Sequence, residues 1–376
     1  IVIAVAALVL WSALSSLWSP ETGSAVAGAL SDGDFNVDAA GVRILLTALA
    51  GTLTLAAALR IPPGRGRKSL FIVGAMLGVH GLLTLAMALL PDTTLSIYAP
   101  FSDPHIEAPQ NILRSANAFL IGIPILLGLA CAFAGRSSVA VCLTLLAISF
   151  VAFLQLGSDV ALLGIVTISI SIGLVLIFVQ LGFRILMCVI ATVILVSPVL
   201  LGVGGAALSR TDVPLPSSVQ SRVWAWQLTA EKIPDRPLTG HGIEASKEWR
   251  DTFGDRPELL RQMIHSTGVD DGRWEVYRIL PGHPHNMGLQ LWGETGLIGV
   301  SLAIAVLLII GWRLPPPGDM PIPTRIAAAS LIGASFALFS LSYSVWNEAF
   351  WATIGVAAAG VILLDRATRP EETPEP

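Results

Sequence analysis

The sequence predicts an all-α polytopic membrane protein, and three observations support this fold class. Of the 376 residues only 13% are charged, about half the share in a soluble domain, and 54% are hydrophobic. The apolar residues gather in runs of about 20, the length that a helix needs to cross the hydrocarbon core of a membrane. Residues 210–285 break this pattern, because they hold 21 of the 48 Asp, Glu, Lys and Arg residues. We therefore expect a set of membrane helices with one large polar loop.

About ten apolar segments are long enough to span a membrane. They divide the chain into about seven N-terminal helices over residues 1–207, a large loop over 208–286, three C-terminal helices over 287–366 and a tail over 367–376. The chain opens inside an apolar stretch, without the basic start or cleavage site of a signal peptide, so we expect a truncated N-terminus. The predicted spans are residues 2–18, 39–59, 69–90, 116–134, 137–156, 159–180, 183–207, 287–311, 324–344 and 348–365.

The basic residues of the short loops predict the orientation. The densest positive cluster runs from Arg60 to Lys68, between the second and third spans, whereas the loop on the other side of the second span is acidic. We expect the Arg60–Lys68 loop to face the cytoplasm and the loop over 208–286 to face outside. Alternate loops on the cytoplasmic side carry Arg136, Arg184, Arg313 and Arg325.

Charge and cysteine usage exclude several classes of function. The net charge of −4 argues against a nucleic-acid partner. Cys131, Cys142 and Cys188 lie within apolar runs and are too few for a disulfide framework or a zinc site, so we interpret them as packing residues. His283 and His285 lack an acidic or cysteine partner at ligand spacing, so we expect no metal and no cofactor.

The polar loop is predicted to be structured. Residues 223–233 have the pattern of a short amphipathic helix, and residues 234–242 are rich in the Pro and Gly of a turn. Connections between helices are usually short, so a structured loop of this length indicates a function.

The sharpest local signal lies where the polar loop meets the eighth span. His283-Pro-His285-Asn286 precedes this helix, and Asn286 is placed to cap its first free amides. His285 would lie beside the positive end of the helix dipole, which favours anionic groups such as phosphates. Asn286, Gln290 and Glu294 share one helical face. Glu294 must face the bundle interior or water, and both a functional role and a structural pairing are open for it.

Three glycines follow in the same helix. Gly293, Gly296 and Gly299 recur every three residues, and we expect them to let another helix approach closely.

At this point the sequence resembles a family. His285-Asn286, followed after nine residues by Gly296-Leu-Ile-Gly299, resembles the signature of the bacterial O-antigen ligase and O-antigen polymerase superfamily. The resemblance extends over nearly the whole chain. Its other elements are Leu17-Trp18-Ser19-Pro20, Arg114 to Asn117, Ser221-Arg222-Val223-Trp224, and Pro237 through Gly240-His241-Gly242.

The resemblance implies a multi-pass protein of the bacterial inner membrane with about twelve spans, so that two would precede Ile1. It implies a GT-C-like glycosyltransferase whose active site faces the periplasm. Such proteins take a glycan from undecaprenyl diphosphate and attach it to lipid A–core or to another lipid-linked repeat, generally without a metal or nucleotide. By matching position, the residues that it implies for catalysis are His285 and Arg222. One departure is Asp159, which stands where many members carry arginine.

Glycosyl transfer from a lipid diphosphate needs a bound anionic leaving group and help with the proton of the acceptor hydroxyl. We predict that Arg222, with Arg114 or Arg278, holds the diphosphate, because arginine forms bidentate contacts with phosphate. A histidine suits the proton transfer, so His285 would act as the base or orient the acceptor. The other substrate-binding candidates are His283, Asn286, Glu294 and Trp224.

Simpler interpretations stay open for both catalytic candidates. His285 could cap the helix or bind a carbonyl, and Arg222 could be an interfacial anchor beside Trp224 and Trp226.

Four interpretations are therefore compared. An O-antigen ligase-like transferase is the first prediction, and a repeat-unit polymerase of the same superfamily is the alternative. The hypothesis of a transporter for the lipid-linked glycan is weaker, because most spans have almost no polar residues. Arg43 and His80 are the main exceptions, and both can be explained by snorkelling or packing. A scaffold without catalysis also stays open because of Asp159.

Overall fold

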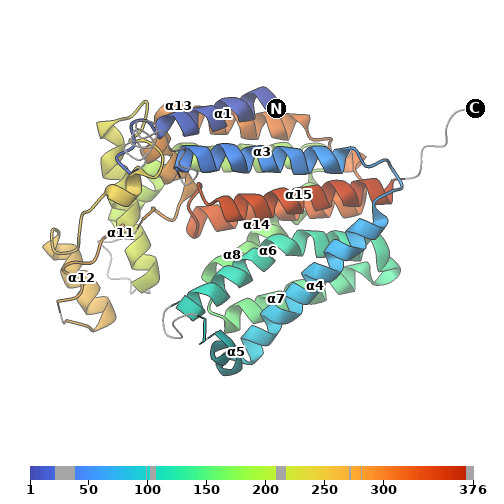
Figure 1. The fold of residues 1–376 in the computed structure, drawn as a ribbon, viewed down its shortest axis with the longest axis horizontal. Helices are drawn as coiled ribbons and strands as arrows, with labels where there is room; N and C mark the ends of the chain where they lie inside the picture. The colour runs from blue at the N-terminus through green and yellow to red at the C-terminus, as the bar shows by residue number, and fades with distance from the viewer. Residues whose placement is uncertain are drawn as a thin grey trace, which may run out of the picture. The chain divides into compact units, whose positions relative to one another are not determined.

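The computed structural model describes residues 1–21, 39–98, 100–101, 107–208, 217–270, 272–280 and 282–369. The described residues are 78% helical, and no strand occurs among them (Figure 1). Within them, nine helices are long and apolar enough to cross a membrane. The prediction of an all-α polytopic membrane protein is confirmed.

Nine of the predicted spans coincide with these long helices. The first predicted span, residues 2–18, differs, because its helix α1 (Val2–Ser15) has 14 residues and is shorter than a helix that crosses the hydrocarbon core. The abutting sixth and seventh spans are separate helices, since α8 (Asp159–Ile177) ends before α9 (Gly182–Ser197) begins.

The chain forms two compact units. The first unit comprises Ile1–Ala48, Met187–Arg313 and Phe339–Glu348. It thus combines membrane helices with the polar segment, the name used from here for residues 208–286. Beside α1 and most of α9, its elements are the start of α3 (Ala40–Leu59), the π-helix η2 (Pro198–Val203), α10 (Gly204–Leu208), α11 (Ser217–Lys232), η3 (Ile233–Asp235), η4 (Ala245–Glu248), α12 (Pro257–Thr267) and α13 (Met287–Arg313).

The second unit comprises Leu49–Leu186, Leu314–Leu338 and Ala349–Pro376. Leu70, Ile125, Ala327 and Leu364 form a buried cluster that joins four of its helices. His80 bonds Ser115 through Nε2 at 3.2 Å, so its position inside a span is explained by a polar partner. The helices of this unit are the rest of α3, α4 (Arg67–Leu89), α5 (Pro91–Tyr98), α6 (Glu107–Phe133), η1 (Gly135–Ser137), α7 (Ser138–Gln155), α8, the start of α9, η5 (Pro317–Asp319), and most of α14 (Ile322–Leu341) and α15 (Glu348–Thr368).

The polar segment has a hydrophobic core of its own. The predicted amphipathic helix is present as α11, and its apolar face packs against α12 and the chain between them. Trp224 and Phe253 meet edge to face with ring centroids 5.3 Å apart. The core residues are Trp224, Ala225, Leu228, Trp249, Phe253, Met263, Ile279 and Leu280. The polar segment is therefore packed around buried side chains, as a structured loop would be.

Helix α13 is broken at Gly296, where the backbone has a φ of 64° and a ψ of −169°. The turn over residues 237–242 lies against the break and bonds the groups that it frees. The amides of Leu297 and Ile298 donate to the carbonyls of Pro237 and Leu238, at 2.9 and 3.2 Å. The amides of His241 and Gly242 donate to the carbonyls of Gly293 and Glu294, at 2.9 and 2.8 Å. A broken helix inside a membrane is tolerated where protein satisfies its backbone in this way.

Gly240 and Gly296 allow this contact. A Cβ atom on Gly240 would lie 2.4 Å from the carbonyl carbon of Glu294, and one on Gly296 would lie 2.4 Å from the carbonyl oxygen of Leu238. The glycines of α13 were predicted to admit another helix, and this is wrong for Gly296, which admits the turn instead. Gly299 does face α1, because its Cβ would lie 3.3 Å from Trp11.

Helix α1 and the residues after it complete this arrangement, with α1 beside α13 (Figure 1). Trp11 Nε1 donates to the carbonyl of Thr295, and Trp18 Nε1 donates to the carbonyl of Gly240, at 3.1 and 3.2 Å. Three of the elements that carry the family resemblance, those around Trp18, Gly240 and Gly296, are therefore in contact within one unit.

Candidate active site

Asn286 begins α13 and caps it as predicted. Its Oδ1 accepts from the amide of Leu289 at 3.0 Å, and its Nδ2 donates to the carbonyl of Ser340 at 3.1 Å. The residue is only 7% exposed. Both ends of its amide are thus used by the protein, and its predicted contact with substrate gains no support from these bonds.

His285 is held in an uncommon conformation with one ring nitrogen bonded. Its φ is 51°, a left-handed value that costs a non-glycine residue energy and is often found at functional sites. Nδ1 lies 2.7 Å from the carbonyl oxygen of Ser342. Because a carbonyl can only accept, Nδ1 carries the proton and the neutral ring keeps its lone pair on Nε2. The simpler interpretation, that His285 binds a carbonyl, is right for Nδ1 and leaves Nε2 for chemistry.

The electrostatic surroundings favour the neutral form of His285. Burial lowers its pKa below the usual value of 6.5, and the charge of Arg222 lowers it further, against the opposing effect of the Ser342 carbonyl. His285 is half-buried, so part of the residue remains accessible from the surface. A neutral imidazole with a lone pair on Nε2 can accept a proton at neutral pH.

His283 supports the backbone of His285. The amide of His285 donates to His283 Nδ1 at 3.2 Å, and the two ring centroids are 4.2 Å apart. Burial is the main cause that lowers the pKa of His283 to about 3, with smaller contributions from His285, when that ring is protonated, and from Lys247. His283 is therefore neutral with its proton on Nε2, which makes it a hydrogen-bond donor.

Two cations lie within electrostatic range of the histidine pair. Arg222 projects from α11 and acts on His285, so the structure brings together the two predicted catalytic residues. Lys247, in η4, acts on His283, and its backbone carbonyl accepts from Arg278 Nη1 at 2.9 Å. Lys247 was missed by the sequence analysis, because it shows no motif and its only signal is its place in the polar segment.

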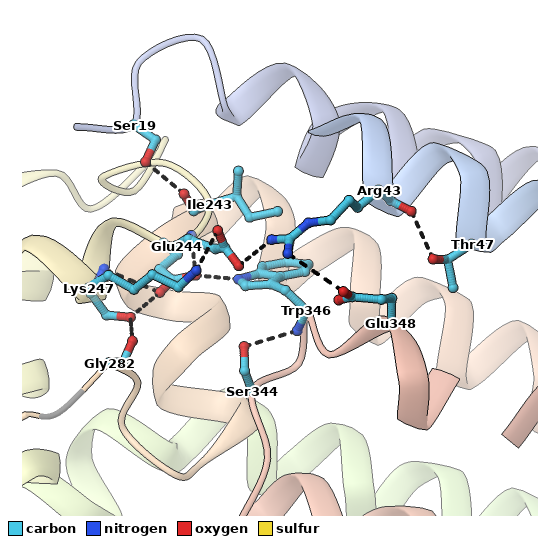
Figure 2. Close-up of polar contacts among 12 residues, drawn as sticks. Ser19, Arg43, Thr47, Ile243, Glu244, Lys247, Gly282, Ser344, Trp346 and Glu348 are labelled. Carbon is cyan, nitrogen blue, oxygen red and sulfur yellow. Dashed lines mark hydrogen bonds and ion pairs between the residues drawn. The ribbon is translucent and has the colours of Figure 1, made fainter. Parts of the chain in front are cut away.

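Lys247 is one part of an ion network that Figure 2 shows. Its Nζ lies 2.8 Å from Glu244 Oε2, and Arg43 Nη2 lies 2.8 Å from Glu244 Oε1. Arg43 Nη1 also lies 3.6 Å from Glu348 Oε1. Glu244, like His285, has a left-handed backbone with a φ of 60°. Arg43 was explained by snorkelling or packing, and the structure adds that its guanidinium pairs with two carboxylates.

Glu294 is fully buried. Of the two roles that were open for it, its contacts favour structural pairing. Its carboxylate accepts from Ser246 Oγ at 2.5 Å, from the amide of Glu244 at 2.9 Å and from Gln290 Nε2 at 3.3 Å. The indole Nε1 of Trp346 also donates to it. Since the side chain has no exposed surface, it cannot touch a substrate in this arrangement.

The remaining predicted residues differ in their surroundings. Trp224 is 1% exposed within the core of the polar segment, which contradicts a direct contact with substrate and also a role for it at the membrane surface. Arg278 is exposed. Arg114 is exposed on α6 in the second unit, where its Nη1 donates to Asn111 at 3.2 Å. Asp159 lies in the first turn of α8, where the helix dipole favours an acidic residue.

Among the described residues no group of three or more His, Cys, Asp or Glu could hold a metal ion. Cys131 and Cys142 are free thiols with sulfur atoms 3.6 Å apart, packed between α6 and α7.

The site thus joins a neutral histidine, with a lone pair on Nε2, to a neighbouring donor histidine and two cations. A neutral imidazole of this kind can accept a proton, and the nearby positive charges favour anionic groups.

Comparison with known proteins supports a ligase-like protein. No family model matches the chain. A protein of Rickettsia prowazekii named as a putative polysaccharide ligase is 28% identical over 150 residues, which are 40% of this chain and 33% of that protein. Proteins of the same name from Rickettsia typhi and Rickettsia felis are 25% identical over 150 residues and 24% identical over 171 residues. These alignments cover 40% and 44% of this chain, and 33% and 36% of the two relatives. The similarity therefore spans about a third of these relatives' length.

Proposed function

We propose that this chain is an O-antigen ligase-like glycosyltransferase of the bacterial inner membrane. It would move a glycan from undecaprenyl diphosphate to a hydroxyl of lipid A–core on the periplasmic face. The observation that carries the proposal is His285, whose Nδ1 is bonded to Ser342 while Nε2 keeps a lone pair, with the positive charge of Arg222 acting on the ring. The names of the Rickettsia relatives support a polysaccharide ligase.

In the proposed reaction, His285 Nε2 takes the proton of the acceptor hydroxyl as its oxygen attacks the anomeric carbon of the glycan. The bond between that carbon and the diphosphate oxygen breaks, and the lipid diphosphate leaves with the electron pair. Direct attack inverts the anomeric configuration. Proton transfer by a positioned side chain contributes about 10²- to 10⁴-fold to a rate.

The leaving diphosphate needs positive charge that is already in place. Arg222 is the first candidate, since its guanidinium can form two parallel bonds with a phosphate. Lys247 and Arg278 lie in the same polar segment, joined by the bond from Arg278 Nη1 to the Lys247 carbonyl. His283 Nε2–H supplies a neutral donor. The proposed step uses no metal and no nucleotide.

The same chemistry would serve a repeat-unit polymerase, whose acceptor is another lipid-linked glycan. The test is complementation of two bacterial mutants, one without O-antigen ligase and one without the polymerase, by the full-length protein. Surface glycan is analysed on gels with expression checked by blot. We expect glycan on lipid A–core in the ligase mutant, lost with His285→Ala and kept with His265→Ala. His265 is the matched control, because it is an exposed histidine on α12 of the same segment.

Each outcome has a clear meaning. Restored chain length in the polymerase mutant instead would make the protein a polymerase. Full activity of His285→Ala would show that the assigned site is wrong. If neither strain responds, the purified protein is given undecaprenyl-diphosphate glycan with lipid A–core or with a second lipid-linked glycan, and no transfer in either mixture would exclude the proposal.

A further inference from the structure

The polar face of α13 binds one loop at three successive turns. The name loop is used for residues 340–346, which comprise the last two residues of α14 and most of the connection to α15. The side chains that bind it are spaced by four, so they lie above one another on the same helical face. In the first turn, Asn286 Nδ2 donates to the Ser340 carbonyl at 3.1 Å. In the second, Gln290 Oε1 accepts from the Val345 amide and Gln290 Nε2 donates to Ser344 Oγ, both at 2.9 Å. In the third, Glu294 accepts from Trp346 Nε1.

The same loop provides the partner of the candidate base. The carbonyl of Ser342, in the middle of the loop, accepts from His285 Nδ1 at 2.7 Å. Ser342 lies between the contacts made by Asn286 and those made by Gln290. The side chains of α13 bind the loop on both sides of Ser342, and they therefore help to set the direction of its carbonyl.

Gln290 is the member of this face whose role can be isolated. Asn286 also caps α13, and Glu294 also binds the backbone of the polar segment at Glu244. Gln290 is 1% exposed, and its bonds go to the loop and to Glu294. Both its oxygen and its nitrogen therefore act on the loop, one on the Val345 amide and one on Ser344.

We propose that Gln290 is a positioning residue that holds the Ser342 carbonyl against His285 and thereby keeps the proton on Nδ1. This inference deepens the proposed function, since it rests on His285 Nε2 as the base. Without the carbonyl in place, the proton can move to Nε2, and the ring then presents N–H instead of a lone pair to the acceptor hydroxyl. Gln290 acts through the tautomer of His285 and does not touch the substrate.

The test is nuclear magnetic resonance of the full-length protein in lipid nanodiscs, with ¹⁵N-labelled histidine. The nitrogen signals of His285 are assigned by their loss in His285→Gln, and they distinguish a protonated from an unprotonated ring nitrogen. In the native protein we expect Nδ1 protonated and Nε2 unprotonated. Gln290→Met keeps the side-chain size and removes its polar atoms, and it should shift the tautomer ratio about tenfold toward Nε2–H, the effect of one hydrogen bond.

A second variant and a control accompany it. Ser344→Ala removes only one of the partners of Gln290 and should shift the ratio in the same direction by less, and it decides the question if Gln290→Met does not fold. Thr167→Val removes a side-chain bond to the Gly333 carbonyl at 2.8 Å in the second unit, and it should leave the tautomer unchanged. Glycan transfer in the complemented strain should fall on the order of ten- to hundredfold with Gln290→Met, by analogy with residues that orient metal-binding histidines.

The readouts separate this inference from the proposed function. An unchanged tautomer in Gln290→Met and Ser344→Ala would overturn the positioning role, even if transfer were lost. A shifted tautomer with full transfer would uphold the role of Gln290 and show instead that His285 is not the base.

Discussion

The packing of Gly240 against the break in α13 can be tested with a single methyl group. Gly240→Ala places a Cβ atom 2.4 Å from the carbonyl carbon and oxygen of Glu294 and 2.5 Å from the amide nitrogen of Thr295. These are backbone atoms of α13, so they cannot rotate away as a side chain would. Two hydrogen bonds next to this residue, from the amides of His241 and Gly242 to α13, would have to shift.

The magnitude has two parts. The φ of Gly240 is 67°, and a left-handed backbone costs alanine about 1–2 kcal/mol. Overpacking adds about 1–3 kcal/mol. The matched control is Gly268→Ala at the end of α12, because Gly268 has nearly the same φ, 68°, and open space within 4 Å of its Cβ position. It should show only the first part.

The assay is unfolding of both variants in the same detergent, followed by tryptophan fluorescence and by the loss of monodisperse protein on size-exclusion chromatography. We expect Gly240→Ala to lose about 2–5 kcal/mol of stability against about 1–2 for Gly268→Ala. Equal losses in the two variants would refute the close packing of the turn on α13.

Three further predictions concern the candidate site. Transfer should fall as acid protonates His285, at a pH below the usual histidine range because its pKa is lowered. Arg222→Gln removes a positive charge that disfavours protonation, so the acid limb of the pH–rate profile should move to higher pH. Glu294→Leu leaves several buried donors unpaired and should destabilise the protein by about 3–5 kcal/mol, measured as loss of folded protein. Glu294→Gln keeps an acceptor oxygen and should lose less stability. Lys247→Met should reduce glycan transfer about tenfold. The control Lys232→Met, which loses a pair with an aspartate in the same segment, should not reduce it. Equal transfer by the two variants would remove Lys247 from the site.

These predictions have different meanings for the proposed reaction. A shift of the acid limb without any change in expression would tie Arg222 to the titration of His285, as expected if the two act on one substrate. An unmoved acid limb would mean that another group controls the pH dependence. The Glu294 variants, by contrast, measure how the polar segment is joined to α13, since this carboxylate accepts from Ser246 Oγ and from the amide of Glu244.

The sequence was sufficient for features that depend on neighbouring residues. Nine long spans were identified because a helix in hydrocarbon must satisfy its own backbone and be apolar over its whole length, which is a property of consecutive residues. The cap at Asn286 and the helix α11 followed for the same reason, since each depends on residues within one or two turns. The shared face of Asn286, Gln290 and Glu294 also followed from helical spacing alone.

Other features could not be read from the chain because they depend on distant partners. The break at Gly296 is explained only by the turn over residues 237–242, and nothing in Gly-Leu-Ile-Gly distinguishes a break from a helix contact. Trp224 carries the pattern of an interfacial residue, yet the fold of the polar segment places it in a core. Lys247 has no local signature, and its relevance comes from its effect on His283.

The sequence by itself determined that this is an all-α membrane protein with a polar segment before the last long spans, and it pointed to His285 at their junction. The tertiary structure decided what His285 can do. Its Nδ1 is bonded to a carbonyl 57 residues further along the chain, and the charge that acts on it comes from Arg222 on another helix. Hydropathy and capping are local properties of a chain, whereas the tautomer and pKa of a side chain depend on whichever groups the fold brings within a few ångströms of it.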